Sequence, residues 1–509
     1  MSLLMGFDLG TTGAKALLID RDGKVISRAF EEYPLHVPKP GWSEQEADDW
    51  WKASVQAIKG AIAGAKVDPA EIAGIGLTGQ MHGLVALDES GKVLRRPILW
   101  NDQRTAEQCR WITERLGGES QAIGLTSNPV LSGFTAPKLI WVRQNEPDIY
   151  SRIRRVLLPK DYVRFKLTGT YASEVSDASG TSLFDVRKRT WSERVTELLD
   201  IPFEMLPDVT ESTTVSGEVN REAATETGLE LGTPAVGGAG DQAAGAVGNG
   251  IARPGVISAT IGTSGVVFAH TEEVKVDPEG RLHTFCHAVP GKWHVMGVML
   301  SAGGSMRWFR DKLGSLEVQE AKARGVDPYE MLTAEASRVP PGSEGLIFLP
   351  YLSGERTPHR DPDARGVFFG LSLRSGKGHL VRAIMEGVAY GMRDSLEIMR
   401  TMGISAEQVR ASGGGARSEL WRQIQADVYG VEIVQMEAEE GPAFGAALLA
   451  GVGVGTYDSV EQACDETVRT VGLVRPNSEN IGLYNQCYAL YGELYRSLRP
   501  RFKESVRIA

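Results

Sequence analysis

The sequence has little of what several protein classes require. Four cysteines are scattered through 509 residues without a CxxC pair, which favours a reducing compartment over a disulfide-stapled fold. The 55 Lys and Arg are outnumbered by 65 Asp and Glu, so the net charge is −10, and neither nucleic acid nor an anionic membrane is an expected partner. The most apolar stretch, 444–455, is rich in glycine and much shorter than the roughly 20 residues of a membrane span. We expect a cytoplasmic protein.

Familiar nucleotide and metal motifs are also missing or fail in context. A P-loop (GxxxxGK[ST]) does not occur. Residues 74–79 match GxGxxG, but that fingerprint needs a helix directly after it, and residues 80–87 are typical of a loop and a strand. His283, Cys286 and His287 have no second cluster to complete a zinc site, so we interpret them as structural. Any nucleotide chemistry should therefore use another fold.

The most informative feature that is present is a turn rich in glycine and hydroxyl groups, which occurs twice. Residues 6–15 (GFDLGTTGAK) and 257–265 (ISATIGTSG) each predict a strand, a tight turn and a second strand. Glycine lets backbone N–H groups approach an anion, and Thr or Ser adds hydroxyl donors. Two related domains that grip one polyphosphate would explain the repetition. Asp8 is then either a Mg²⁺ partner or a carboxylate that stabilises the turn.

The length and the periodicity predict two large domains. The patterns predict strands at 3–9, 14–20, 25–32 and 72–77 and helices at 47–64, 379–402 and 418–430. This order indicates an α/β fold in which helices cover mixed sheets. Glycines and a proline interrupt the periodicity at 246–254, so we assign one domain to residues 1–248 and a second to 249–509, with a ligand cleft between them.

Asp241 is the most suggestive carboxylate in the chain. It follows a short apolar strand, 234–236, and lies among small residues that leave it open to a ligand. It is either the cap of a following helix or a general base that accepts a hydroxyl proton during phosphoryl transfer. Polar groups follow two other apolar strands, at the edge where open α/β sheets bind ligands. The predicted substrate contacts are Gln80, Met81, His82, Trp100, Asn101, Asp102, Asp241 and Gln242.

Longer segments resemble the FGGY carbohydrate kinases and, within that family, the xylulokinases. The two family signatures match residues 133–145 and 366–386, and the blocks that resemble xylulokinases are 79–83, 99–102, 158–162 and 351–359. The resemblance implies two ribonuclease-H-like domains of the actin, hexokinase and Hsp70 ATPase type with a central cleft. It also implies transfer of the ATP γ-phosphoryl group to D-xylulose, with Mg²⁺ as cofactor.

The resemblance assigns roles to single residues. Asp241 matches the catalytic base, Met81 and His82 match the sugar contacts, and Asp8 matches the Mg²⁺-associated aspartate. The residues expected at the nucleotide are Thr11, Thr12, Lys15, Gly262, Thr263, Gly304, Gly413, Gly414 and Arg417. Ser418 stands where several members carry Asn, which leaves the purine contacts there open.

Several alternatives remain open. The acceptor could be ribulose, an alditol or another polyol instead of D-xylulose. The chain could also be a non-catalytic sugar sensor, although a sensor needs no base such as Asp241, or an ATP-driven module like actin or Hsp70. A homodimer is an expectation from the family only.

Overall fold

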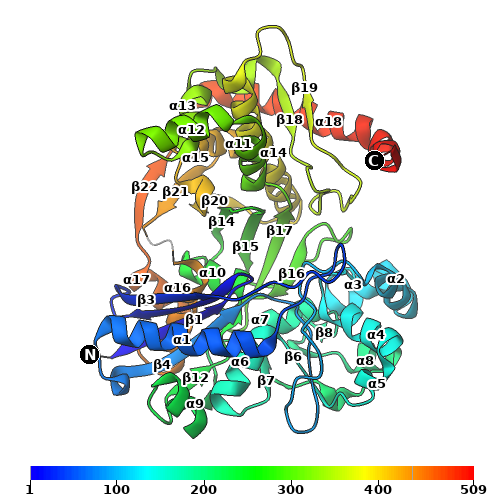
Figure 1. The fold of residues 1–509 in the computed structure, drawn as a ribbon. Coiled ribbons are helices and arrows are strands. Elements are labelled where there is room, and N and C mark those ends of the chain that lie inside the picture. The colour runs from blue at the N-terminus through cyan, green and yellow to red at the C-terminus, as the bar shows by residue number, and fades with distance from the viewer. Residues whose placement is uncertain (1, 438–439, 509) are drawn as a thin grey trace.

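The fold has two halves, each built around a mixed β-sheet, and the computed structural model describes residues 2–437 and 440–508 (Figure 1). The first sheet has seven strands in the order β11-β12-β4-β1-β2-β3, with β13 beside β4. These strands are β1 (Leu3–Leu9), β2 (Gly13–Ile19), β3 (Val25–Glu32), β4 (Ile72–Gly79), β11 (Val215–Glu218), β12 (Pro234–Val236) and β13 (Ala239–Gly240).

The second sheet also has seven strands, in the order β16-β17-β15-β14-β20-β21-β22. These strands are β14 (Gly255–Ile261), β15 (Gly265–Thr271), β16 (His283–Cys286), β17 (Trp293–Met299), β20 (Ala406–Ser412), β21 (Glu432–Met436) and β22 (Thr470–Val474). β14 pairs antiparallel with β15 and parallel with β20, just as β1 pairs antiparallel with β2 and parallel with β4. The repetition predicted from the two turns is therefore confirmed in the sheets themselves.

Helices cover both faces of the first sheet. Side chains alternate along β1, so Leu3, Met5 and Phe7 join a core with helices α1, α6 and α9, while Leu4 joins a core with α10, α16 and α17 on the other face. These helices are α1 (Ala47–Ala65), α6 (Pro159–Thr168), α9 (Arg221–Thr227), α10 (Asp241–Gly248), α16 (Gly441–Gly453) and α17 (Val460–Thr467). A strand buried on both faces is an almost continuous apolar run, as in LLMGFDL.

Helix α16 comes from the C-terminal part of the sequence but covers the first sheet. A side chain at Gly6 or Gly76 would overlap the backbone carbonyl of Ala443 or Ala446 on α16, so glycine in both strands allows the helix to lie directly on the sheet. α16 also packs closely against α10, the helix that begins at Asp241. The division of the chain at residue 248 stays a prediction.

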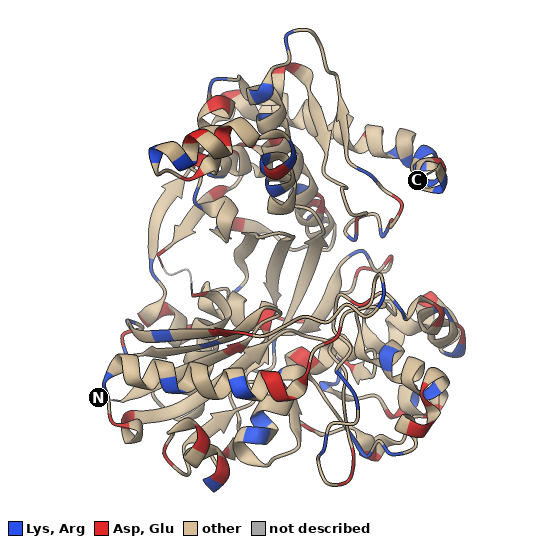
Figure 2. Cartoon of the chain, in the orientation of Figure 1, with Lys and Arg blue, Asp and Glu red and all other residues tan. Residues whose placement is uncertain are grey.

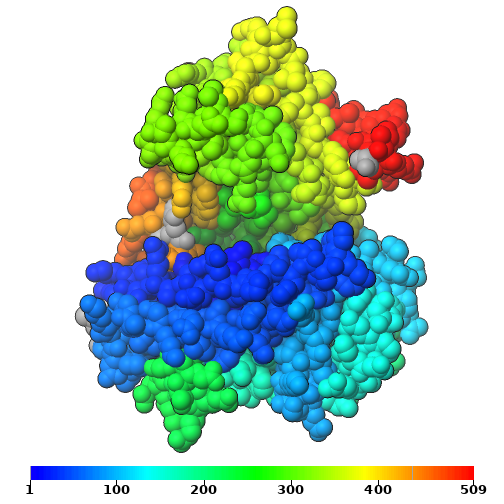
Figure 3. All heavy atoms as spheres, viewed as in Figure 1, coloured from blue at the N-terminus to red at the C-terminus, as the bar shows by residue number. Residues whose placement is uncertain are grey.

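The second half has helices of its own. They are α11 (Gly303–Leu313), α12 (Ser315–Arg324), α13 (Pro328–Ser337), α14 (Lys377–Thr401), α15 (Glu419–Tyr429) and α18 (Ser478–Ile508), with a hairpin of β18 (Ile347–Leu349) and β19 (Val367–Phe369) beside them. α14 and α15 confirm the predicted helices at 379–402 and 418–430 to within two residues. Figure 3 shows the two halves stacked, with the N-terminal residues in blue below.

A lobe at the side of the first half completes the structure. Its elements are α2 (Ala106–Arg115), α3 (Glu119–Thr126), α4 (Thr135–Asn145), α5 (Pro147–Tyr150), α7 (Val175–Ala178), α8 (Glu193–Leu199), β5 (Val85–Leu87), β6 (Arg155–Leu157), β7 (Ala172–Glu174), β8 (Phe184–Asp185), β9 (Thr190–Trp191) and β10 (Asp208–Thr210). After the GxGxxG match inside β4 the next regular element is strand β5, which confirms that no dinucleotide-binding helix follows.

Surface charge and hydropathy agree with the composition. Figure 2 shows acidic and basic residues interspersed along the helices of both halves. Within residues 2–437 and 440–508, no helix combines the length and the apolar character that crossing a bilayer requires.

Candidate active site

Three strand ends bring the predicted polar residues together. β1, β4 and β13 are parallel neighbours, with Asp8 opposite Thr78 and Gly240 opposite Gly79. The carboxyl ends of these strands therefore meet at one edge, where Gln80 and Asp241 follow their strands directly. This edge is where open α/β sheets bind ligands. Asp241 is the first residue of α10 and its N-cap is Gly240, so Asp241 does not cap the helix.

The carboxyls of Asp8 and Asp241 influence each other. Burial raises the pKa of Asp8 to about 6, an effect that the positive charge of Lys15 opposes. Burial also raises the pKa of Asp241 to about 7, and the negative charge of Asp8 adds to the rise. Asp8 Oδ1 has no hydrogen-bond partner within the described part of the chain. Two buried carboxyls, one with an unused oxygen, suit a hard cation such as Mg²⁺, which binds few protein ligands and otherwise keeps water or phosphate oxygens.

Two predicted sugar ligands hold the first turn in place. The indole Nε1 of Trp100 donates to Thr11 Oγ1 at 3.0 Å. Gln45 Nε2 donates to the Thr11 carbonyl at 2.7 Å, and Gln80 Nε2 donates to Gln45 Oε1 at 2.9 Å. The Thr12 side chain beside them is exposed. Trp100 and Gln80 thus support the turn, and Gln80 Oε1 is left buried without a partner among the described residues.

Lys15 forms an ion pair with a residue from the C-terminal part of the sequence. Its ammonium contacts the carboxylate of Glu440, which directly precedes α16, and Arg28 contacts the same carboxylate. In this arrangement Lys15 faces an acidic side chain. A role for Lys15 toward phosphate stays a prediction.

The second turn lies against the start of a helix. Gly262 N–H donates to the Ser264 carbonyl at 2.9 Å, which closes the turn. The N–H groups of Gly303 and Gly304, the first residues of α11, donate to the carbonyls of Gly262 and Thr263 at 2.9 and 3.0 Å. A side chain at Gly303 would overlap the Gly262 carbonyl, which explains glycine at this position. The N-terminal end of a helix favours negative charge, but these two N–H groups are occupied by the turn, so phosphate binding at this corner stays a prediction.

A cavity of about 330 Å³ joins Asp241 to the segment predicted to contact adenosine. Asp241, Gln242, Gly413, Gly414 and Arg417 all line it. Its size falls in the range of small-ligand pockets. Its walls come from α10, from β14 and β15 of the second sheet and from the loop after β20, so the cavity lies between the two halves.

The loop after β20 owes its shape to two local features. A side chain at Gly413, where φ is 75°, would meet the Ile261 carbonyl at 2.6 Å. Ser418 caps α15 by accepting from Trp421 N–H at 3.2 Å. Ser418 is therefore the N-cap of α15, a position that serine favours.

His82 occupies a strained and enclosed position just after β4. Its φ is +69°, and its carbonyl accepts from Lys138 Nζ at 2.8 Å and from Thr135 Oγ1 at 3.0 Å. The imidazole lies 4.8 Å from the ring of Phe134. Burial holds the pKa of His82 well below its usual range, and the charge of Lys138 acts in the same direction. Strained backbone of this kind is concentrated at functional sites.

Met81, Asn101 and Asp102 differ in what they offer a ligand. Met81 packs against Gly240, where a side chain would meet its sulfur at 2.8 Å. Asp102 is fully buried, and its carboxylate accepts from Ser43 N–H at 2.6 Å and from Arg104 Nη2 at 2.7 Å. Asn101 Oδ1 is buried with no partner in the part of the chain that is described. Asn101 thus has a free acceptor, whereas Asp102 mainly holds its own loop.

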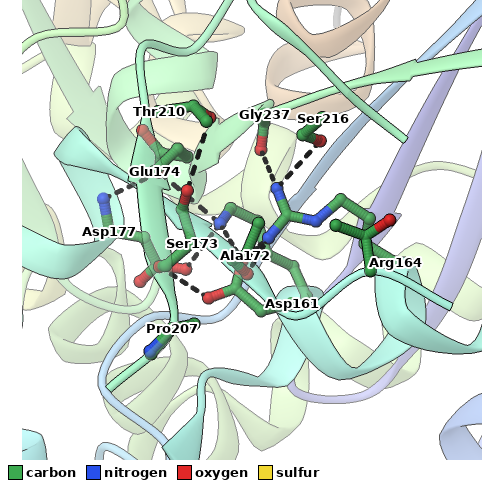
Figure 4. A network of polar contacts seen from close by, with 12 residues as sticks. Asp161, Arg164, Ala172, Ser173, Glu174, Asp177, Pro207, Thr210, Ser216 and Gly237 are labelled. Carbon is green, nitrogen blue, oxygen red and sulfur yellow. Dashed lines mark hydrogen bonds and ion pairs between the residues drawn. The ribbon is translucent and has the colours of Figure 1, made fainter. Parts of the chain in front are cut away.

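Sequence reasoning missed a buried ionic network, whose contacts Figure 4 shows. Lys160 Nζ lies 2.7 Å from Asp161 Oδ1, 3.5 Å from Glu174 Oε1 and 3.2 Å from Asp177 Oδ2. All four side chains are at most 1% exposed. The network reaches the residues just before Asp241 through two other side chains, Arg164 and Ser176.

Both connections are hydrogen bonds to the backbone within residues 237–240. Arg164 Nη1 donates to the Gly237 carbonyl at 3.4 Å, and Ser176 Oγ accepts from Gly240 N–H at 3.0 Å. Lys160 and Asp161 belong to the block 158–162, whose only distinction in the sequence is its resemblance to xylulokinases. That block is the one signal in the sequence that could have led to the network.

The histidines and cysteine considered for zinc lie next to the His82 end of this site, where the ring of Phe134 is 5.8 Å from that of His283. His283 and Cys286 are on β16, and His287 Nε2 lies 2.9 Å from the Ile251 carbonyl. Among residues 2–437 and 440–508, no three His, Cys, Asp or Glu side chains are placed to hold a metal together. All four cysteines are free thiols.

Comparison with known proteins defines the family. Residues 3–248 match the N-terminal domain of the FGGY family of carbohydrate kinases, and residues 257–454 match its C-terminal domain. Xylulose kinase of Bacillus subtilis (strain 168) is 38% identical over 97% of this chain and 97% of its own length. Xylulose kinase of Escherichia coli (strain K12) is 39% identical over 98% of this chain and 99% of its own length.

Other relatives extend the comparison. Gluconokinase of Bacillus subtilis (strain 168) is 33% identical over 91% of this chain and 90% of its own length. The crystal structure of xylulose kinase from Rhodospirillum rubrum has a TM-score of 0.90 at 31% identity, and the match covers 98% of this chain and 100% of that one. The chain belongs to the FGGY family of carbohydrate kinases. It is a sugar phosphotransferase with the two-domain fold of the actin and hexokinase type.

Proposed function

We propose that this enzyme transfers the γ-phosphoryl group of ATP to D-xylulose, forming D-xylulose 5-phosphate, with Asp241 as the general base. The observation that carries the proposal is the position of Asp241. It lies where the ends of β1, β4 and β13 meet, and it lines the same cavity as Gly413 and Gly414. The near-full-length similarity to xylulose kinases supports D-xylulose as the acceptor.

Asp241 has the acidity that a general base needs at neutral pH. Its pKa of about 7 leaves a substantial ionised fraction while keeping the carboxylate basic enough to take a proton. The terminal hydroxyl of the sugar would donate its proton to Asp241 as its oxygen bonds to the γ-phosphorus and the bond to the ADP oxygen breaks. Positioning and charge neutralisation account for most of the rate in such transfers.

The remaining groups would bind Mg²⁺, the phosphates and the nucleoside. Asp8, directly or through water, would hold Mg²⁺, which when bound neutralises charge on the phosphates. The two turns, with Thr11, Thr12 and Thr263, would surround the phosphates, and the N-terminal end of α11 would favour their charge. Gly413 and Gly414 leave room for the nucleoside against the backbone. Closure of the two halves would exclude water, which otherwise competes with the sugar as acceptor.

Gluconate is the acceptor most in need of comparison, because a gluconokinase is also a near-full-length relative. The test is an ATPase assay coupled to ADP release, run with D-xylulose, D-ribulose, glycerol and D-gluconate and without acceptor. We expect D-xylulose to give the highest kcat/KM. If another acceptor exceeds it tenfold or more, the enzyme is a kinase for that acceptor and the assignment to D-xylulose is wrong.

A further inference from the structure

A glycine that sequence reasoning did not single out controls the orientation of His82. Gly180 lies in the short 3-10 turn Ser179–Thr181, and its carbonyl oxygen is 2.8 Å from His82 Nδ1. A carbonyl oxygen only accepts hydrogen bonds, so Nδ1 must carry the hydrogen. Burial keeps the pKa of the imidazole well below its usual range, so the ring is neutral and has one N–H. Nε2 is therefore a hydrogen-bond acceptor.

The ring also needs the space that glycine leaves. A side chain at residue 180 would overlap His82 at Cε1 and Nδ1 and would lie 3.4 Å from Met81 Cε. The backbone at Gly180 has φ −89° and ψ 17°, which residues with a side chain also adopt. Local backbone conformation therefore does not require glycine here. The close approach of the imidazole does.

The chain segment 174–181, which includes Gly180, also contacts Gly240, the residue directly before Asp241. Glu174 is the first residue of this segment and the N-cap of α7. Its carboxylate accepts from the N–H groups of Ser176 and Asp177 at 2.7 and 2.8 Å. Ser176 Oγ donates to Glu174 Oε1 at 2.9 Å and accepts from Gly240 N–H at 3.0 Å. Lys160 Nζ also lies 3.5 Å from Glu174 Oε1, and Figure 4 shows Glu174 within the surrounding polar network. The segment 174–181 thus contacts both His82 and Gly240, the residue before Asp241.

We propose that Gly180 is a positioning residue for the sugar: its carbonyl and its missing side chain hold His82 so that Nε2 accepts a hydrogen bond from a sugar hydroxyl. Because Ser176 and Gly180 belong to the same segment, that hydroxyl is held at a set distance from Asp241. An acceptor molecule without a hydroxyl donor at this place leaves Nε2 unpaired and binds more weakly. The proposal concerns the sugar half of the site only and rests on the proposed kinase function.

The kinetic test replaces Gly180 with alanine. We expect Gly180→Ala to raise KM for D-xylulose by roughly 5- to 150-fold, the factor that corresponds to losing one buried polar partner. KM for ATP should stay within about twofold, since the nucleotide contacts lie elsewhere. The matched control is Gly124→Ala on α3, where a new side chain would meet no atom within 4 Å. An unchanged KM for D-xylulose in Gly180→Ala would overturn the proposal.

A second measurement needs no variant of Gly180. In protein labelled with ¹⁵N-histidine, ring ¹⁵N shifts distinguish a protonated nitrogen from an unprotonated one, and the loss of signals in His82→Gln assigns them. We expect Nδ1 to be protonated and Nε2 to be bare in the free enzyme, and the opposite tautomer would contradict the proposal. If the wild-type enzyme phosphorylates no sugar, the proposed function fails, and this measurement still decides the tautomer.

Discussion

Replacing Asp241 by asparagine should slow the enzyme and stabilise it at the same time. The amide keeps the shape of the carboxyl but accepts no proton, so kcat should fall roughly 10²- to 10⁴-fold, the usual contribution of a general base. Binding of the sugar should change much less, because the hydrogen-bonding shape is retained. The two opposite effects separate the loss of a base from damage to the fold.

The stability effect follows from the raised pKa. The pKa of Asp241 is about 7 in the folded enzyme and near its usual value of 3.8 in the unfolded chain. Between these values the folded state binds more protons, so the free energy of unfolding falls as pH rises from about 4 to about 7. The substituted asparagine would carry no charge and escape this loss. At pH 8 we expect Asp241→Asn to be more stable by an amount on the order of 1–4 kcal/mol, and at pH 4 the difference should largely vanish.

The assay pairs steady-state kinetics with urea unfolding at pH 4 and pH 8. Asp394 on α14 is a matched control, because burial raises its pKa to about 7 as well and its carboxylate accepts from Tyr488 Oη at 2.7 Å. Asp394→Asn should leave kcat within about twofold. Turnover near the wild-type value in Asp241→Asn would remove Asp241 from the mechanism. A large loss of stability at pH 8 would show that the carboxylate is structural.

Four further outcomes are expected. Asp8→Ala should raise the Mg²⁺ concentration at half-maximal activity, and an unchanged titration would leave Asp8 only its place in the turn. The acid limb of the pH profile of kcat/KM should lie near pH 7, where Asp241 ionises. It should move to lower pH in Asp8→Asn, because the negative charge that raises the pKa of Asp241 is gone, and an unchanged limb would contradict this coupling. His82→Ala should raise KM for D-xylulose roughly 5- to 150-fold but not KM for ATP, and equal changes in both would argue against a sugar contact. Lys160→Met should lower the free energy of unfolding by about 3–5 kcal/mol, since it takes the ammonium away from three buried carboxyls, of which Asp161 keeps Arg164 as a second cation. A loss below about 1 kcal/mol would show that the network is already neutral.

The parts of the fold that local sequence determines were predicted correctly. The run 3–9 is apolar enough to be a buried strand, the turn after it needs glycine, and α1 shows helical spacing from Ala47 onward. Such features depend on residues a few positions apart, so they are visible in the chain itself. The repeated hairpin therefore indicated two related halves. The strand predicted at 234–236 is also present, as β12, and the structure adds the short strand β13 directly before Asp241.

Tertiary structure alone decided what each polar side chain contacts. The Nδ1 of His82 meets a carbonyl 98 positions away, and Lys15 pairs with a carboxylate 425 positions away. Trp100 turned out to support the first turn, and Asp102 to hold Arg104. Partners so distant in the chain meet only when helices and sheets pack, and no local pattern encodes them.

The glycines show most clearly which features the local sequence determines and which depend on tertiary structure. The sequence by itself determined where the chain turns, because a tight turn asks for glycine within a few residues. It did not determine why Gly6, Gly76 and Gly180 lack side chains, since each makes room for a distant part of the chain: two for α16 and one for His82. Close packing leaves no space for even one extra carbon at these points. Only the folded chain reveals which neighbour occupies it.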